Sequence, residues 1–180
     1  MLEIMKVVVI SASPRKNGNT HVIMKYIFEY TKLKNIDTKL INLSDGQIEC
    51  YRGPEEEYNE YTKNAANDIM DADVWLIGSP IYNSFFSSAL KNLFEYVNYK
   101  KTEGKVAGMM ILASSSIGFT DVQTLITQLL SYFRVITNPK AVFFTTDSIS
   151  GNIVSKDEDI KRLKELVDET LRISAKLHQD

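Results

Sequence analysis

The feature that most constrains the fold is a repeated alternation between short β-rich runs and amphipathic helical runs. The β-rich runs are residues 6–11 (KVVVIS), 37–43 (DTKLINL), 73–79 (DVWLIGS) and 105–113 (KVAGMMILA), with a last strand expected within 135–146, in its second part AVFFTT. The first run is continuously apolar, which is typical of a strand covered on both faces. Apolar residues at helical spacing separate the runs, and a final helix is expected from Asp157 onward.

Five such β-α units predict a parallel sheet with helices on both faces, because right-handed crossovers place each helix against the sheet. We expect a three-layer α/β fold with a five-stranded parallel sheet in the flavodoxin-like order 2-1-3-4-5. The chain has 180 residues, which predicts one domain spanning 1–180. In sheets of this kind, ligands bind beyond the carboxyl ends of the strands where the order reverses. The loops after strands one, three and four are therefore the candidate site.

The loop after the first strand, residues 11–20 (SASPRKNGNT), has the composition of an anion-binding segment. It leads into a helix, whose first N–H groups and dipole favour a negative charge. Its hydroxyls, amides and cations can add hydrogen bonds; the candidates are Ser11, Ser13, Arg15, Asn17, Asn19 and Thr20. Neither the Walker pattern nor the dinucleotide pattern GxGxxG is present, so a mononucleotide is favoured. A plain capped helix remains an alternative for this loop.

The loops after the third and fourth strands have the composition of a shelf for a flat ring. The first runs through Pro80, Ile81, Tyr82, Asn83 and Ser84, and the second contains Ser114, Ser115, Ser116 and Gly118. N–H donors in the second loop would stabilise negative charge that develops on a reduced flavin. Each loop taken alone is also explained by an ordinary helix cap. Phe85, Phe86 and Phe94 are candidates for the core or for an oligomer face, and we expect a mixture, because the adjacent Phe85 and Phe86 cannot both point inward.

These residues resemble the NADPH-dependent FMN reductase family. The carriers of the resemblance are the pattern S-x-S-x-R at Ser11–Arg15 with Asn19 and Thr20, then P-x-Y-N at Pro80–Asn83 and L-K-N at Leu90–Asn92. The resemblance implies bound FMN, with phosphate contacts from the first loop and ring contacts from Pro80–Ser84 and Ser114–Gly118. It also implies NADPH or NADH as electron donor, and a homodimer or homotetramer.

The sequence departs from family patterns at three places. Ile81 stands where the reductase branch often has Glu, and Ser114–Ser116 replace glycines. The first loop is also similar to the iron–sulfur flavoprotein branch, whose members carry a cysteine cluster after strand two. Here Cys50 is the only cysteine, so we expect no such cluster, and Cys50 is interpreted as a partly buried small residue.

Composition and charge argue against several function classes. The net charge of −2 gives no reason to expect nucleic acid or an anionic membrane as partner. No apolar stretch approaches the roughly 20 residues that span a bilayer, so a cytoplasmic location is expected. The two histidines, His21 and His178, are far apart, so no metal site is expected.

We therefore expect an FMN-dependent NAD(P)H oxidoreductase. Hydride would pass from NAD(P)H to FMN and then, by a ping-pong mechanism, to a small acceptor such as a flavin, quinone, azo compound or metal ion. The flavin performs the chemistry, so no protein side chain is assigned a catalytic role. The alternative is a non-enzymatic carrier, like a flavodoxin, that passes electrons between protein partners.

Overall fold

A parallel sheet forms the centre of the computed structural model, which describes residues 5–178. Its strands are β1 (Lys6–Ser11), β2 (Asp37–Asn42), β3 (Val74–Pro80), β4 (Val106–Ala113), β5 (Ile136–Thr137) and β6 (Val142–Thr145). The order is β2-β1-β3-β4-β5, and β6 also pairs with β4. The predicted flavodoxin-like order is confirmed. Residues 1–4 and 179–180, which the expected domain of 1–180 includes, lie outside the described residues.

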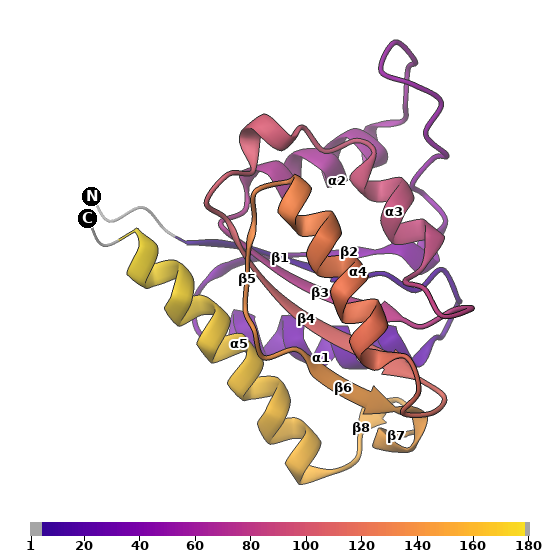
Figure 1. Ribbon diagram of the computed structural model, residues 1–180, viewed down its shortest axis with the longest axis vertical. Helices are drawn as coiled ribbons and strands as arrows, with labels where there is room; N and C mark the ends of the chain where they lie inside the picture. Colours follow the sequence, from indigo (N-terminus) through magenta and orange to yellow (C-terminus); the bar gives the residue numbers. More distant parts are fainter. Residues whose placement is uncertain (1–4, 179–180) are drawn as a thin grey trace.

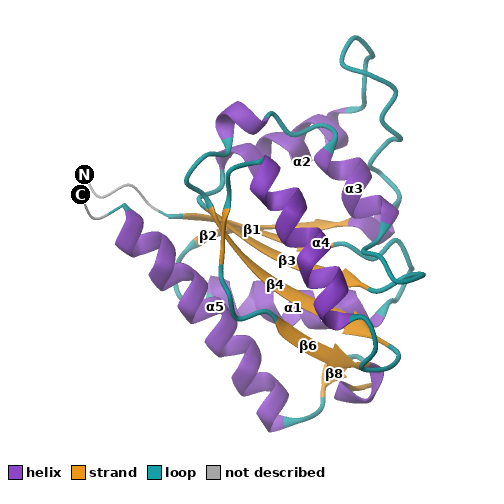
Figure 2. Cartoon of the chain, viewed as in Figure 1, coloured by secondary structure: helices purple, strands orange, loops and turns teal. Residues whose placement is uncertain are grey.

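Five helices cover the two faces of the sheet (Figures 1 and 2). They are α1 (Asn19–Lys32) and α5 (Asp157–Leu177) on one face, and α2 (Glu60–Asp71), α3 (Ser88–Phe94) and α4 (Phe119–Tyr132) on the other. Short 3-10 turns span Leu43–Asp45, Tyr99–Lys101 and Thr146–Ser148. None of the helices within residues 5–178 combines the length and apolar character needed to cross a membrane.

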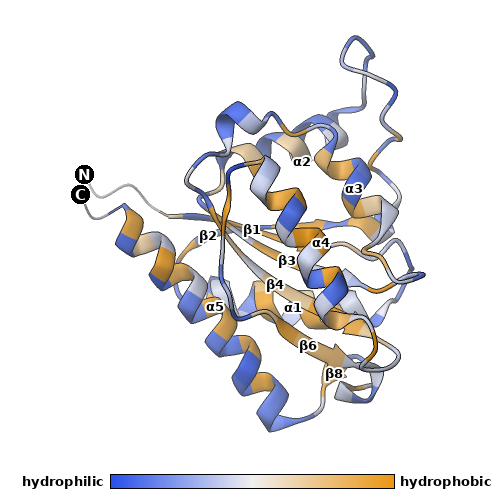
Figure 3. Cartoon of the chain, viewed as in Figure 1, coloured by the Kyte–Doolittle hydropathy of each residue, from blue (hydrophilic) through white to orange (hydrophobic). Residues whose placement is uncertain are grey.

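The side chains of the central strands alternate between the two helical layers. In β3, Trp75 and Ile77 pack under α2, α3 and α4, whereas Val74 and Leu76 pack against α1 and α5. All four side chains are buried, so β3 is apolar on both faces, as Figure 3 shows for the centre of the sheet. This double coverage is the physical reason why the strands read as continuous apolar runs.

The register of the central strands brings their carboxyl ends to one edge of the sheet. Ser11 of β1 lies opposite Gly78 of β3, and Pro80 of β3 lies opposite Leu112 of β4. Backbone hydrogen bonds continue past the strand ends, from Ala12 N–H to the Gly78 carbonyl at 2.8 Å and from Ile81 N–H to the Leu112 carbonyl at 2.9 Å. The loops after β1, β3 and β4 therefore leave the sheet side by side.

The fifth strand position is filled by two pieces rather than one. β6 lies within the predicted AVFFTT segment, but β5 precedes it and pairs with the beginning of β4. Pro139 lies between them and has no N–H to donate, so the ladder breaks there, as is tolerated at a sheet edge. The Asn138 amide instead donates to Thr170 Oγ1 of α5 at 3.0 Å. A small antiparallel hairpin, β7 (Ile149–Ser150) with β8 (Ile153–Val154), was not predicted.

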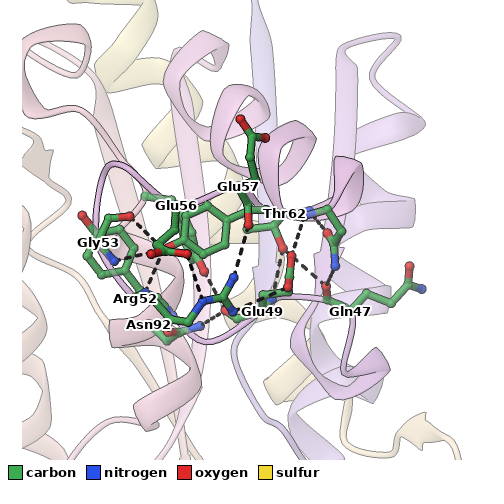
Figure 4. Close-up of polar contacts among 12 residues, drawn as sticks. Gln47, Glu49, Arg52, Gly53, Glu56, Glu57, Thr62 and Asn92 are labelled. Carbon is green, nitrogen blue, oxygen red and sulfur yellow. Dashed lines mark hydrogen bonds and ion pairs between the residues drawn. The ribbon is translucent and has the colours of Figure 1, made fainter.

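The longest loop, residues 46–59 between the first 3-10 turn and α2, rises away from the sheet (Figure 1). It is held by an amide clamp from α3: Asn92 donates to the Glu49 carbonyl at 2.7 Å and accepts from the Tyr51 N–H at 2.8 Å (Figure 4). The two bonds flank Cys50, whose side chain is exposed. The expectation of a partly buried Cys50 is wrong. The backbone groups on either side of it, the Glu49 carbonyl and the Tyr51 N–H, bond to Asn92, and the Cys50 side chain faces solvent.

Three tyrosines complete the anchorage of this loop. Tyr51 and Tyr58 stack with ring centroids 6.1 Å apart, and Tyr96, two residues beyond the end of α3, meets both rings edge-on. The Tyr96 hydroxyl donates to the Glu49 carbonyl at 2.8 Å. Burial, with the nearby Tyr58 and the Glu49 carboxylate, raises the pKa of Tyr96 to about 12. The rings and the clamp together fix a segment that has no helix or strand of its own.

We expect the substitution Asn92→Ala to loosen this loop. Both clamp bonds are lost: the Tyr51 N–H is left without its partner, and the Glu49 carbonyl keeps only the Tyr96 hydroxyl. The unpaired N–H costs about 1–3 kcal/mol in the free energy of unfolding. The freed backbone around Arg52 then becomes a substrate for trypsin, so limited proteolysis followed by mass spectrometry should show faster cleavage after Arg52. Asn98→Ala is the matched control, because Asn98 caps a turn outside the loop. Equal cleavage rates in the two variants would contradict the clamp.

Candidate functional site

A cavity of about 1000 Å³ opens at the carboxyl ends of the central strands. Three loops form it, those after β1, β3 and β4, which are the loops that the strand order singles out. A fourth contribution comes from Thr146, just after β6. The lining residues are Ser13, Arg15, Lys16, Asn17, Gly18, Asn19, Thr20, Pro80, Ile81, Tyr82, Asn83, Leu112, Ala113, Ser114 and Thr146.

The first loop forms a cradle at the start of α1. Gly18 precedes the helix in an extended conformation and provides no capping side chain, so the first N–H groups of α1 are available to a ligand. A Cβ at Gly18 would lie 3.0 Å from the Arg15 carbonyl oxygen and 3.1 Å from Ser13 Oγ, so a larger residue would require the loop to shift slightly. The result is a compact turn that leads into α1, with the first N–H groups of that helix beside the cavity.

The charge of the cavity favours an anion. Arg15 and Lys16 both line it, and the amino end of α1 adds the positive end of a helix dipole. Among the lining residues, all of which the structure describes, none is acidic. An anionic group bound there meets cations and N–H donors without a competing carboxylate.

The loop after β3 forms a tight turn beside the cradle. Tyr82 and Phe85 exchange backbone hydrogen bonds of 2.9 and 3.0 Å, and the two residues between them, Asn83 and Ser84, have φ values of 49° and 64°. A left-handed conformation is unfavourable for serine, and such strain often marks a functional site. The turn directs Tyr82 toward the cradle, where its hydroxyl lies 3.0 Å from Ser13 Oγ.

The two loops are thus joined across the cavity. Ser13 Oγ also accepts the Arg15 N–H at 3.2 Å, and the Arg15 guanidinium lies 5.8 Å from the centroid of the Tyr82 ring. One hydroxyl therefore contacts both the loop after β1 and the loop after β3. This arrangement fixes the polar end of the cavity relative to its apolar wall, which Pro80, Ile81, Leu112 and Ala113 provide.

The structure brings most of the predicted site residues to the cavity, but not all of them. Ser13, Arg15, Asn17, Asn19, Thr20, Pro80, Ile81, Tyr82, Asn83 and Ser114 line it. Ser11, Ser84, Ser115, Ser116 and Gly118 do not. Ser11 lies inside β1 and is fully buried, and Ser84 lies on the turn beyond the cavity wall. Ser115 and Ser116 are exposed, and Gly118 is the residue that precedes α4.

The lining residues that the site prediction omits are Lys16, Gly18, Leu112, Ala113 and Thr146. Leu112 and Ala113 are the last two residues of β4, and apolar side chains there continue the pattern of a buried strand, so the sequence gives no separate signal that they line a site. Thr146 follows the last strand, so the rule that ligands bind beyond strand ends would have pointed to it. The helix cap that was the alternative for the loop after β3 lies beyond Pro80–Ser84, because Ser87 caps α3 by accepting the Leu90 N–H at 3.1 Å.

Comparison with known proteins agrees with this geometry. Residues 5–148 match the model of the NADPH-dependent FMN reductase family. A NAD(P)H-dependent FAD/FMN reductase of Geobacillus thermodenitrificans is 27% identical over 127 residues, 70% of this chain and 69% of that protein. An NADPH azoreductase of a Bacillus species is 30% identical over 115 residues, 63% of this chain and 62% of that protein.

Solved structures support the same fold. An NADH:FMN oxidoreductase (EMOB), solved in its apo form, superposes with a TM-score of 0.76 at 19% identity, covering 98% of this chain and 91% of that one. The family match spans the sheet and all three loops of the cavity. The chain belongs to the NADPH-dependent FMN reductase family.

Proposed function

We propose that this protein transfers electrons from NAD(P)H to a small acceptor, through FMN held in the cavity at the strand ends. The observation that carries the proposal is the meeting, in one open cavity, of an anion cradle and an apolar wall. The cradle comes from residues 13–20, and the wall comes from Pro80, Ile81, Leu112 and Ala113. Membership of an FMN reductase family supports an enzyme rather than a carrier between proteins.

The residues present fit FMN at both ends of the cavity. A phosphate would accept hydrogen bonds from the first turn of α1 and from Ser13, Asn19 and Thr20, with Arg15 and Lys16 balancing its charge. The flat ring system would lie against the apolar wall, with Tyr82 and Ser114 at its edges. The volume of about 1000 Å³ reaches the upper end of ordinary ligand cavities, which leaves room for a second molecule beside the cofactor.

The protein's own residues bind, orient and shield; FMN, when bound, supplies the electron-transfer chemistry. The Ser13–Tyr82 contact would hold the phosphate end and the ring end at a fixed separation. The overall reaction consumes NAD(P)H, a proton and the oxidised acceptor, and yields NAD(P)⁺ and the acceptor reduced by two electrons and two protons. Donor and acceptor would share this one open cavity, so we infer that they visit the site in turn.

Three finer features stay predictions. The acceptor class, whether flavin, quinone, azo compound or metal ion, is one of them. The others are a dimer or tetramer as the assembled state and a cytoplasmic location. The Bacillus relative is named an azoreductase, which supports azo compounds among the candidates.

The double substitution Ser13→Ala with Arg15→Ala tests the position of the phosphate. We expect the Kd for FMN, measured by quenching of flavin fluorescence, to rise at least about tenfold, since charged hydrogen bonds contribute roughly 1.5–3 kcal/mol. The Kd for riboflavin, which has no phosphate, should change less than about twofold. Arg172→Ala, on the exposed side of α5, is the control. Equal losses for both ligands would show that the phosphate is bound elsewhere.

Steady-state kinetics test whether donor and acceptor occupy the site one after the other. With NADPH varied at several fixed concentrations of menadione, double-reciprocal plots should give parallel lines, because each substrate leaves before the other enters. Lines that intersect would require donor and acceptor to be bound together, and would contradict a shared site.

A further inference from the structure

A second cavity of about 420 Å³ adjoins the first. Tyr82 and Asn83 line both cavities, so the two cavities meet at these residues. The other side of the second cavity is formed by Phe85, Phe86 and Lys91, with two serines at the start of α3. Its volume lies within the range of small-molecule sites. A molecule in this cavity therefore lies directly beside the contents of the first.

The surface of the second cavity is aromatic. Phe86 is buried, whereas 48% of Phe85 is exposed, which confirms the expectation that the pair is divided between core and surface. The ring centroids are 4.8 Å apart. The left-handed turn at Asn83 and Ser84 places Phe85 there, through its backbone bonds to Tyr82. A strained turn that holds a large apolar side chain at a cavity wall favours a ligand with an aromatic face.

Lys91 provides one cation at the edge of this aromatic surface. Its ammonium pairs with Glu95 one turn along α3, and both side chains are close to half exposed, at 49% and 42%. Exposed pairs of this kind contribute little to stability, so an anionic ligand can replace Glu95 as the partner of Lys91. Among the residues that line the second cavity, all of them described, none is acidic.

We propose that the second cavity is the acceptor subsite, and that it selects planar aromatic acceptors that carry an anionic substituent such as a sulfonate. The aromatic part lies on Phe85 and reaches past Tyr82 into the first cavity, while the anion contacts Lys91. The proposal rests on the proposed function, because it assigns a substrate class to the same reaction. It divides the two tasks of the site: Arg15 and Lys16 serve the cofactor phosphate, and Lys91 serves the acceptor.

The test compares naphthoquinone with its sulfonated derivative as acceptors, using the FMN-loaded protein with saturating NADPH. For Lys91→Gln we expect KM for the sulfonate to rise about threefold to fivefold, the range of an exposed charge pair, with KM for the neutral quinone unchanged. Glu95→Gln should lower KM for the sulfonate, because it removes the competing carboxylate. Phe85→Ala should raise KM for both acceptors. Lys32→Gln, an equal charge change at the far end of α1, should alter neither.

Equilibrium binding provides a readout that does not depend on turnover. Titration calorimetry with naphthalenesulfonate, which accepts no electrons, should show weaker binding to Lys91→Gln by the same factor. Equal effects of Lys91→Gln on the two acceptors, or a sulfonate dependence that follows Arg15→Ala instead, would overturn the subsite. Naphthalenesulfonate binding through Lys91 without any NADPH-driven reduction would uphold the subsite and refute the proposed function.

Discussion

The alignment of β1, β3 and β4 at their carboxyl ends is the constraint on which the rest of the site depends. Ser11 lies opposite Gly78, and Pro80 lies opposite Leu112, so the loops that follow start from one edge. The uncapped start of α1 and the apolar end of β4 then face the same space. A shift of one residue in either pairing would move each side chain of the shifted strand from one helical layer to the other. The double burial of β3 between two helical layers makes such a shift costly.

The architecture could be predicted because the burial of strands and helices produces a simple pattern of apolar residues in the sequence. The central strands β1, β3 and β4 are covered on both faces and are continuous apolar runs, and five strands separated by helices allow few topologies. The break in the fifth strand was not predicted, since it depends on Pro139 and on the contact of Asn138 with Thr170 across the fold. The hairpin formed by β7 and β8 has only two residues in each strand, which is too short for a periodic signal.

The location of the candidate site could be predicted from the sequence, but the residues that line it could be predicted only in part. Loop composition identifies the segments, but the backbone path decides which side chains enter the cavity. Ser11 fits the family pattern and yet is buried within β1. The L-K-N motif shows the same point: Lys91 borders the second cavity, whereas Asn92 clamps the loop around Cys50. Neither role follows from spacing alone, because both partners are distant in sequence.

We propose above all that FMN, held in the cavity at the strand ends, accepts electrons from NAD(P)H. The most direct measurement is the absorbance spectrum of the purified, FMN-loaded protein under anaerobic conditions, before and after one equivalent of NADPH. We predict that the flavin band bleaches with NADPH or with NADH, and that an added quinone restores it. A flavin band that persists with both donors would contradict the claim.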